Sequence, residues 1–304
     1  MRNLKNKAFT LIELLVVIAI IGILSALIIV GMSSATQKAN FAKAQVFANS
    51  LRSSLLNNMI SEWKLDNGSG TSATDSWTGN NTGTLTGFTS TAAGYGDTNT
   101  SGWMSSSNCV YGTCLKFEGS VNYISLASNY IFTNNNTLSF WAKINAQDYL
   151  GIVGGNLGNW SYLRFGYDAG QYNHDICGET NTDNDEIDLH FNSLINTGQW
   201  YHFAITEDGS NVWKLYLNGI LQTDTQTTTN GNLTIRRIGE ARQGFDRFNG
   251  SLDDIRIYNA VVPTSKIQQD YYAGLAKLLA DGQIDENEYI GHMGALIGNL
   301  AKTR

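Results

Sequence analysis

The chain has little charge and few of the residues from which metal and redox sites are built. Of its 304 residues, 15% are charged, the formal net charge is −6, and there are only 3 cysteines and 4 histidines. No basic tract is present, which argues against nucleic-acid binding. No glycine-rich phosphate loop, Ser-His-Asp arrangement or His/Cys metal spacing is found either. The middle of the chain is instead crowded with Gly, Asn, Thr and Ser, a composition that suits a rigid β-protein with a polar surface outside the cell.

Charge is absent altogether from residues 14–32, an apolar run that is long enough to cross a bilayer as a helix. Arg2, Lys5 and Lys7 precede this run, so the positive-inside tendency places the N-terminus in the cytoplasm and the rest of the chain outside. Glu13 lies directly before the run, where an ionised carboxylate costs about 2–3 kcal/mol or more unless it has a partner. Glu13 is therefore the residue that requires an explanation.

The residues around Glu13 supply one. The sequence AFTLIE at residues 8–13 resembles the processing signature of type IV prepilins, in which a membrane peptidase cuts directly before the Phe. The resemblance implies cleavage between Ala8 and Phe9, and N-methylation of Phe9. In that family the Glu of one subunit is thought to meet the N-terminal amine of a neighbour, so Glu13 would direct filament assembly. Ala8 stands where the family usually has Gly, a departure that could slow cleavage without abolishing it.

Two other interpretations of this segment stay open, a plain N-terminal membrane anchor and a secretory signal peptide. In a signal peptide the apolar stretch precedes the cut and is discarded, whereas here the predicted cut precedes the apolar stretch. The prepilin interpretation implies a single-pass precursor in the inner (cytoplasmic) membrane, N-terminus in and C-terminus out, and an extracellular filament after assembly. Its partners would be a prepilin peptidase, the inner-membrane assembly machinery, other pilins and further copies of this chain.

Helical character continues from residue 33 to about residue 60. This segment contains neither proline nor glycine, apart from a glycine before it at position 31, and its apolar residues follow the i, i+4 stripe of an amphipathic helix. Together with the anchor it predicts one helix of roughly 80 Å over residues 9–60. The stripe consists of Ala44, Phe47, Ala48, Leu51, Leu55, Leu56, Met59 and Ile60.

Between residues 61 and 262 the pattern changes to short alternating runs separated by turn signals, which predicts an antiparallel β-sandwich. Residues 137–144, 200–205 and 213–217 are representative strands. The turn signals are Asn67-Gly68, Asp208-Gly209, Asn218-Gly219, Asn230-Gly231 and Asn249-Gly250.

Six phrases in this region resemble the recurring phrases of laminin-G-like, concanavalin A-like jelly rolls. Their order and spacing agree over residues 63–258, so the resemblance implies a jelly-roll fold, although a fold does not by itself specify a function. The phrases are WKLDNGSG at 63–70, CLKFEG at 114–119, LSFW at 138–141, GQWYH at 198–202, KLYLNG at 214–219 and FNGSLDDIRIY at 248–258.

Cys109 and Cys114 flank a tight loop, NCVYGTC, and in an exported protein such a pair usually forms a disulfide. Closing so short a loop should contribute only about 2 kcal/mol. Cys177 is left over, and we consider it a buried small hydrophobe, an intermolecular bridge or a reactive thiol.

The tail, residues 263–304, is helical again. Asp281-Gly282 is a helix stop, and residues 285–288 form a capping box that begins a second helix. The predicted helical hairpin is similar to the short C-terminal hairpins of many bacterial surface and membrane proteins, which suggests docking and not catalysis.

Concanavalin A-like folds include glycosidases that place their catalytic carboxylates in an E-x-D-x-E run. Glu186 and Asp188 begin such a run, but His190 stands at the position of the second Glu, and in the bulged variant of the motif Phe191 stands there. Because the proton donor is missing, we expect no enzymatic activity.

Carbohydrate binding is predicted at residues 160–167, where period two places Trp160, Tyr162 and Arg164 on one face of a strand. Sugars stack on such aromatic side chains, although the same pattern also fits a sandwich core or a loop clamp. Surface glycans are therefore candidate partners.

No cofactor is required by these motifs, but two places could bind calcium. Asp253, Ile255 and Ile257 alternate along one predicted strand, so the pattern predicts that Asp253 points toward the core as the two Ile side chains do. A carboxylate in the core needs hydrogen bonds or an ion. In related sandwiches the first and last strands pair, which would bring Asp66 near Asp253. The acidic segment at residues 183–188 is the second place, although solvated charge runs are commoner.

The sequence thus predicts a mainly β protein with an N-terminal helix. It comprises a prepilin leader (1–8), a pilin-type helix (9–60, membrane span about 9–32), a jelly-roll head (61–262) and a C-terminal helical hairpin (263–304). The predicted function is a type IV pilin-like or pseudopilin subunit of an extracellular filament, with a head for adhesion or surface interaction. The alternatives are a membrane-anchored, lectin-like surface protein and a degenerate glycosidase-like domain. A surface pilus, a type II secretion pseudopilus and a DNA-uptake filament all fit this prediction.

Overall fold

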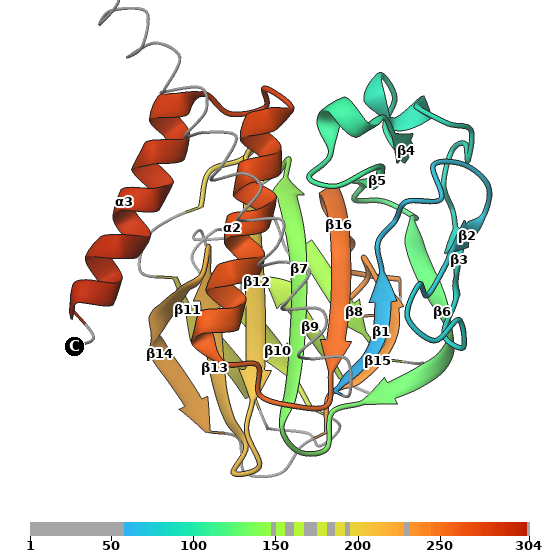
Figure 1. Ribbon diagram of the computed structural model, residues 1–304. Coiled ribbons are helices and arrows are strands. Elements are labelled where there is room, and N and C mark those ends of the chain that lie inside the picture. Colours follow the sequence, from blue (N-terminus) through green and yellow to red (C-terminus); the bar gives the residue numbers. More distant parts are fainter. Residues whose placement is uncertain are drawn as a thin grey trace, which may run out of the picture. The chain divides into compact units, whose positions relative to one another are not determined.

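The computed structural model describes residues 58–146, 150–155, 161–166, 175–180, 186–191, 195–227, 232–242 and 244–302. Within these residues the chain forms two eight-stranded antiparallel sheets, one behind the other in Figure 1. The first sheet contains β1 (Met59–Trp63), β4 (Gly102–Met104), β5 (Cys114–Glu118), β7 (Asn136–Ile144), β12 (Trp200–Glu207), β13 (Val212–Leu217), β14 (Ile220–Thr227) and β16 (Asn249–Tyr258). The second sheet contains β2 (Ser72–Ala73), β3 (Gly83–Thr86), β6 (Tyr123–Ile131), β8 (Leu150–Gly154), β9 (Tyr162–Phe165), β10 (Asp175–Glu179), β11 (Glu186–His190) and β15 (Thr234–Ile238).

The strand order of each sheet joins segments that are far apart in the sequence. The first sheet runs β14-β13-β12-β7-β16-β5-β4, and β1 also pairs with β16. The second sheet runs β11-β10-β9-β8-β15-β6-β3-β2. The first and last strands of the domain therefore pair, as the resemblance to related sandwiches implies, and the predicted mainly β sandwich is confirmed.

Aromatic side chains from both sheets fill the space between them. The ring of Phe203 on β12 lies 5.2 Å from that of Phe140 on β7 and 5.2 Å from that of Phe165 on β9 in the other sheet. All three side chains are buried, together with apolar residues of nearly every strand. Because side chains alternate along a strand, the residues between these positions point to the two outer faces.

The turn signals had different outcomes. Asn218 and Gly219 both have positive φ, 51° and 76°, which is the conformation of the two-residue hairpin that joins β13 to β14. Asn249-Gly250, in contrast, does not form a turn but begins β16. A Cβ at Gly250 would lie 2.1 Å from the carbonyl oxygen of Lys143, so glycine is needed there for close strand contact. Asn230 and Gly231 lie outside the described residues.

The N-terminal edge of the domain also differs from the prediction. Met59 and Ile60, the last two residues of the predicted helical stripe, are extended and belong to β1. Met59 and Trp63 of this strand are buried against the sandwich, which explains why they are apolar. The rest of the predicted helix and membrane span lies outside the described residues. In the described part, no helix is long and apolar enough to span a membrane.

The predicted C-terminal hairpin is confirmed as α2 (Thr264–Ala280) and α3 (Glu286–Lys302). Gly282, with φ of 70°, ends the first helix, and the Asp285 carboxylate accepts a 2.8 Å hydrogen bond from the backbone N–H of Glu288 at the start of the second. Figure 1 shows α2 lying across β12 and β7 on the outer face of the first sheet, with α3 beside it. Trp141 on β7 stacks on Tyr271 of α2 with ring centroids 5.7 Å apart.

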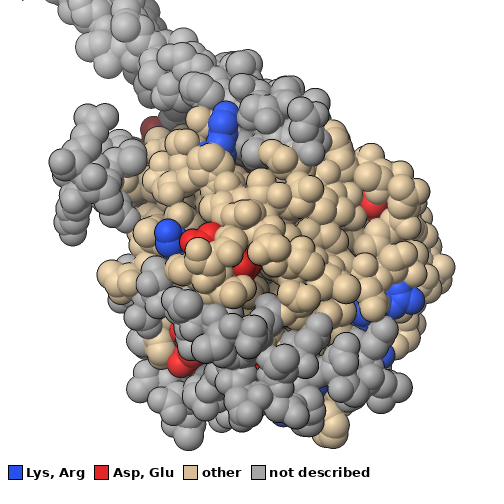
Figure 2. Space-filling view, turned by 90° about the horizontal axis from the view of Figure 1, so that it is seen from below, with Lys and Arg blue, Asp and Glu red and all other residues tan. Residues whose placement is uncertain are grey.

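The surface reflects the low charge of the sequence. Figure 2 shows the face at the lower end of Figure 1, where the described residues are mostly uncharged. Exposed large apolar side chains are found singly among the described residues, with Phe245 the most exposed at 69%.

Candidate functional site

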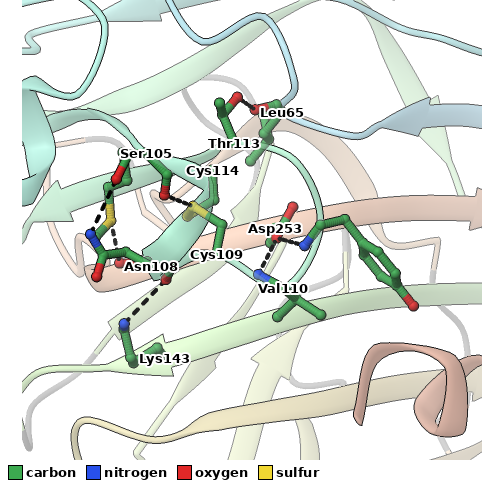
Figure 3. Close-up of a disulfide and its surroundings, with 12 residues drawn as sticks. Leu65, Ser105, Asn108, Cys109, Val110, Thr113, Cys114, Lys143 and Asp253 are labelled. Atoms are coloured by element: carbon green, nitrogen blue, oxygen red, sulfur yellow. Dashed lines mark hydrogen bonds between the residues drawn. A yellow bond between two sulfur atoms is a disulfide. The ribbon is translucent and has the colours of Figure 1, made fainter. Parts of the chain in front are cut away.

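The disulfide loop is anchored by two carboxylates from other parts of the chain, Asp253 and Asp66, and Figure 3 shows Asp253 beside the loop. Cys109 and Cys114 form the predicted disulfide, with Cα atoms 5.5 Å apart. The Oδ2 atom of Asp253 accepts hydrogen bonds of 2.9 Å from the backbone N–H groups of both Val110 and Tyr111. Residues between the two cysteines are therefore held by the last strand of the sandwich.

Asp66 holds the other side of the same loop. Its Oδ1 atom accepts a 2.8 Å hydrogen bond from the backbone N–H of Thr113, and the Thr113 hydroxyl donates to the carbonyl oxygen of Leu65. Asp253 and Asp66 thus both bind backbone N–H groups of residues 110–113, which places the two carboxylates at the same loop, as strand pairing predicted. The sequence therefore predicted that Asp66 and Asp253 lie close together. It did not indicate that both bind the disulfide loop.

Asp253 is buried, but it faces the opposite side of the sheet from the one predicted. It pairs with Trp141, on the face that α2 covers, whereas Ile255 and Ile257 lie in the core between the sheets. The reason is a β-bulge between Asp253 and Arg256, where Asp254 has a φ of 49°. An extra residue in one strand reverses the alternation of side chains beyond it. The face of Asp253 was predicted from Ile255 and Ile257, which lie on the other side of the bulge, and the prediction was therefore wrong.

Burial and the neighbouring carboxylates Asp254 and Asp66 raise the pKa of Asp253 well above its ordinary value, against the hydrogen bonds from the loop. Its Oδ1 atom has no hydrogen-bond partner among the described residues. Such an oxygen can be satisfied by a bound proton or by a cation. Calcium would take about six to eight oxygen ligands, more than these two carboxylates supply, so waters would have to complete its coordination.

A second buried network lies beside Asp253, around Arg256. The guanidinium contacts Glu62 at 3.2 Å, Asp254 at 2.6 Å and Asp270 of α2 at 2.5 Å. Asp270 also contacts Nε2 of His202 at 3.1 Å. These contacts attach α2 to β1, β12 and β16, so the network is explained by docking of the hairpin.

The charges of this network perturb its carboxyl groups in opposite directions. Burial raises the pKa of Asp254 to about 7, although Arg256 opposes the shift. Burial alone would also raise the pKa of Asp270, but Arg256 and His202 more than offset it and hold the pKa below its ordinary value.

The predicted carbohydrate-binding residues lie on the outer face of the second sheet, at β9. Tyr162 and Arg164 share this face, with the guanidinium carbon 5.3 Å from the ring centroid. Trp160 lies outside the described residues. Both described side chains are largely buried, with 4% and 7% exposed. They are therefore not an open stacking platform in this conformation.

Both side chains have polar partners that sequence reasoning missed. The Arg164 guanidinium donates to Asp246 at 2.7 Å, and Arg242 contacts the same carboxylate at 2.5 Å. The Tyr162 hydroxyl donates to Glu179 at 2.9 Å. Arg242 and Asp246 lie 78 and 82 residues after Arg164 in the sequence, and no local pattern links them to β9.

Cys177 on β10 lies in the same network. It is a free thiol with 1% of its surface exposed, and burial raises its pKa to about 12, against the effect of Arg164. Its sulfur accepts from Nε of Arg164 at 3.5 Å. These properties match the buried small residue among the three roles considered for it.

The E-x-D-x-H run occupies β11, and its alternation is confirmed. Ile187, Leu189 and Phe191 are buried in the core between the sheets, so Asp188 and His190 lie on the outer face. His190 pairs directly with Asp175 of β10, a residue that sequence reasoning did not select. Asp175, Asp188 and His190 each offer a ligand atom, and these atoms lie within 4.8 Å of one another.

A polar cleft of about 340 Å³ lies where the hairpin meets the first sheet. Lys143 and Trp200 line one wall, and Gln283, Glu288 and His292 line the other. The Lys143 ammonium lies 5.0 Å from the Trp200 ring centroid, and both side chains donate to the carbonyl oxygen of Asn108. The lysine therefore occupies one face of the indole that a sugar would otherwise stack on.

The remaining predicted residues, Ala8, Phe9 and Glu13, lie outside the described residues. Comparison with known families nevertheless bears on them. The model of the prokaryotic N-terminal methylation motif matches residues 3–29. The model of the concanavalin A-like lectin/glucanases superfamily matches residues 118–268. No curated protein matches the chain.

Solved structures are similar to the sandwich in fold. One is domain 4 of an extracellular arabinanase from Geobacillus stearothermophilus, in complex with arabinotriose, with 19% identity and a TM-score of 0.50 over 70% of this chain and 98% of that domain. Another is the binding domain of botulinum neurotoxin serotype D, with 17% identity and a TM-score of 0.50 over 73% of this chain. This chain spans 53% of that binding domain.

These matches agree with the two resemblances found in the sequence, and they locate them in separate segments. The chain thus joins a segment that matches the prokaryotic N-terminal methylation motif to a segment that matches the concanavalin A-like lectin/glucanases superfamily.

Proposed function

We propose that this protein is a type IV pilin-like or pseudopilin structural subunit of an extracellular filament, and that its concanavalin A-like domain serves adhesion or surface interaction. The observation that carries the proposal is the methylation motif at residues 3–29, followed by a separate β-sandwich domain. The disulfide between Cys109 and Cys114 is consistent with an exported domain, because such bonds persist in oxidising compartments.

The proposal assigns roles to residues at the N-terminus. A prepilin peptidase cleaves between Ala8 and Phe9, and the Phe9 amine is methylated. The precursor resides in the inner membrane with its C-terminus outside, and the assembly machinery adds it to other pilins or to copies of itself. Glu13 directs assembly because its carboxylate finds the N-terminal amine of a neighbouring subunit.

N-terminal sequencing and mass spectrometry of the mature protein test this proposal. We expect a chain that begins at methylated Phe9. Ala8→Trp should block maturation because the peptidase no longer meets a small residue, whereas the conservative Asn6→Gln should mature normally. A mature protein that begins at Met1, or beyond Met32, would contradict the pilin proposal.

A second candidate function is carbohydrate binding at residues 160–167, which requires Tyr162 and Arg164, buried in this conformation, to become exposed to a sugar. The arabinanase domain of similar fold was solved with arabinotriose, which supports the same ligand class. Glycan arrays probed with the wild-type chain and with Trp160→Ala test this function. Loss of binding with unchanged thermal stability would support it, and a stability loss without any glycan binding by the wild type would contradict it.

We infer that the domain binds and does not cleave its ligand, because His190 replaces the carboxylic acid that a double-displacement glycosidase needs. No cofactor is required for the proposed function, and calcium at Asp66 and Asp253 is a further proposal. Hydrolysis of any member of a polysaccharide panel by the purified chain, lost in Glu186→Gln, would contradict the binding-only role.

A further inference from the structure

Two adjacent strands bring one His and two Asp side chains, residue types that can ligate metals, onto one outer face. β10 and β11 are antiparallel, with Asp175 directly opposite His190 and Cys177 opposite Asp188. Directly opposed residues of an antiparallel pair project to the same face, and so do residues two apart on one strand. The strand register is therefore sufficient to place Asp175, Asp188 and His190 close together on one face.

The distances are close to those of a bound cation. All three ligand atoms lie within 4.8 Å of one another, and Nε2 of His190 lies 3.7 Å from Oδ2 of Asp188. Metal–ligand bonds of about 2.1 Å in a tetrahedral site place neighbouring ligand atoms about 3.4 Å apart. Side-chain rotations would therefore have to bring the ligand atoms closer together by up to about 1.4 Å.

Burial gives the three residues different roles. Asp175 has 1% of its surface exposed and lies in the floor of the cluster. The side chains of Asp188 and His190 are 24% and 41% exposed, so they can rotate and solvent reaches them. A cation held by these three groups would keep a coordination position for water or for a ligand oxygen.

Charge favours a cation at this position. The carboxylates of Asp175 and Asp188 both contribute ligand atoms to this cluster. A divalent ion would offset the repulsion between the carboxylates. One imidazole nitrogen and two carboxylate oxygens form a ligand set suited to zinc and similar divalent transition metals, whereas calcium prefers oxygen alone.

We propose that Asp175, Asp188 and His190 form a binding site for one divalent transition-metal ion, with Zn²⁺ as the best match. This inference does not depend on the pilin assignment, because it uses residues of the sandwich alone. The site presents the metal on the outer face of the second sheet, beside Cys177 and Arg164.

Metal titration of the full chain, solubilised in detergent and stripped with EDTA, tests the proposal. Zn²⁺ binding is followed by calorimetry, and Co²⁺ serves as a spectroscopic probe whose visible absorption reports low-symmetry nitrogen and oxygen coordination. We expect one site per chain. His190→Ala should weaken binding by more than the roughly 10- to 100-fold that loss of an outer-sphere partner causes.

Asp188→Asn is the second variant, because it preserves shape and lies on the solvent-accessible side of the cluster. His292→Ala is the matched control, since it removes an imidazole from the hairpin and should leave metal affinity unchanged. The proposal is overturned if the wild type binds neither metal, if both site variants bind as the wild type does, or if Ca²⁺ binds this site more tightly than Zn²⁺.

Discussion

The carboxylate of Asp253 accepts a 2.9 Å hydrogen bond from the backbone N–H of Val110, a residue 143 positions earlier in the chain. Val110 lies inside the loop closed by the Cys109–Cys114 disulfide, and Tyr111 donates a second bond to the same oxygen. The disulfide therefore does more than close a short loop, because it keeps two N–H donors aimed at a buried carboxyl group.

This arrangement predicts that removing the disulfide costs more than its loop length suggests. Cys109→Ser combined with Cys114→Ser should lose about 2 kcal/mol from loop closure. A further loss of about 1–3 kcal/mol is expected because Asp253 loses its donors when the loop relaxes. Urea unfolding of the full chain measures both contributions.

The control is the same pair of substitutions in an Asp253→Ala background, where no side-chain oxygen is left to accept from the loop N–H groups. There the loss should fall toward about 2 kcal/mol. Equal losses in the two backgrounds would show that Asp253 and the disulfide act independently. Addition of Ca²⁺ should stabilise the wild type and not Asp253→Asn if an ion, and not a proton, satisfies this carboxylate.

A pH-dependent effect is predicted for Asp254. Its pKa is raised to about 7 in the folded protein from an ordinary value of 3.8, so the folded state holds the proton more tightly. Stability from this group is thus present at low pH and is lost as the pH rises toward 7, by about 1.4 kcal/mol per unit. Asp254→Asn should therefore gain about 2–3 kcal/mol relative to the wild type between pH 5 and pH 8.

Urea unfolding of the wild type and of Asp254→Asn at pH 5 and pH 8 provides the measurement. For each protein, the free energy of unfolding at pH 8 is compared with that at pH 5. Asp270 has a lowered pKa, so its contribution is lost only at more acidic pH and does not interfere in this window. A stability difference that is the same at both pH values would contradict the role assigned to Asp254.

Docking of the hairpin predicts opposite effects for two glycine substitutions. A Cβ at Gly274 of α2 would lie 2.2 Å from Cζ2 of Trp141, so Gly274→Ala should destabilise by about 1–3 kcal/mol through overpacking. Gly291 of α3 has no atom within 4 Å of an added Cβ, so Gly291→Ala should stabilise by about 0.5–1 kcal/mol. Thermal unfolding compares the two. A neutral Gly274→Ala would mean that α2 does not rest on Trp141 in solution.

Filament assembly provides the last prediction, which rests on the proposed role of Glu13. Glu13→Val removes an unpaired acid from the membrane helix, so insertion should remain intact while polymerisation is reduced or misdirected. Electron microscopy of filament number and length is the measurement, with Thr10→Val as the control that keeps the acid. Filaments of normal length formed at the normal rate by Glu13→Val would remove Glu13 from the assembly mechanism.

Local patterns in the sequence were sufficient for much of the fold. Alternation located β7, β12 and β13, the Asn218-Gly219 pair located a hairpin turn, and the Asp281-Gly282 stop separated two helices. Each of these features depends on residues that are neighbours in the chain, which is why sequence reasoning reached them. The methylation motif and the Cys109–Cys114 pair are equally local.

Other features were decided by contacts between distant segments. The bulge at Asp254 reversed the orientation of Asp253, Asn249-Gly250 continued into a strand, and Met59 joined the sheet instead of the helical stripe. In each case pairing with β7, β5 or β16 supplied backbone hydrogen bonds that outweighed the local preference.

The sequence by itself determined the N-terminal methylation motif, the sandwich class and the hairpin, because each is encoded by composition or spacing within a short window. Only the tertiary structure decided which polar residues meet. The register of β10 and β11 places Asp175 opposite His190. The fold also brings Asp246 into contact with Arg164, which lies 82 positions earlier in the chain. Periodicity assigns a side chain to a face of its strand, but which strand lies beside it follows from burial of the whole core.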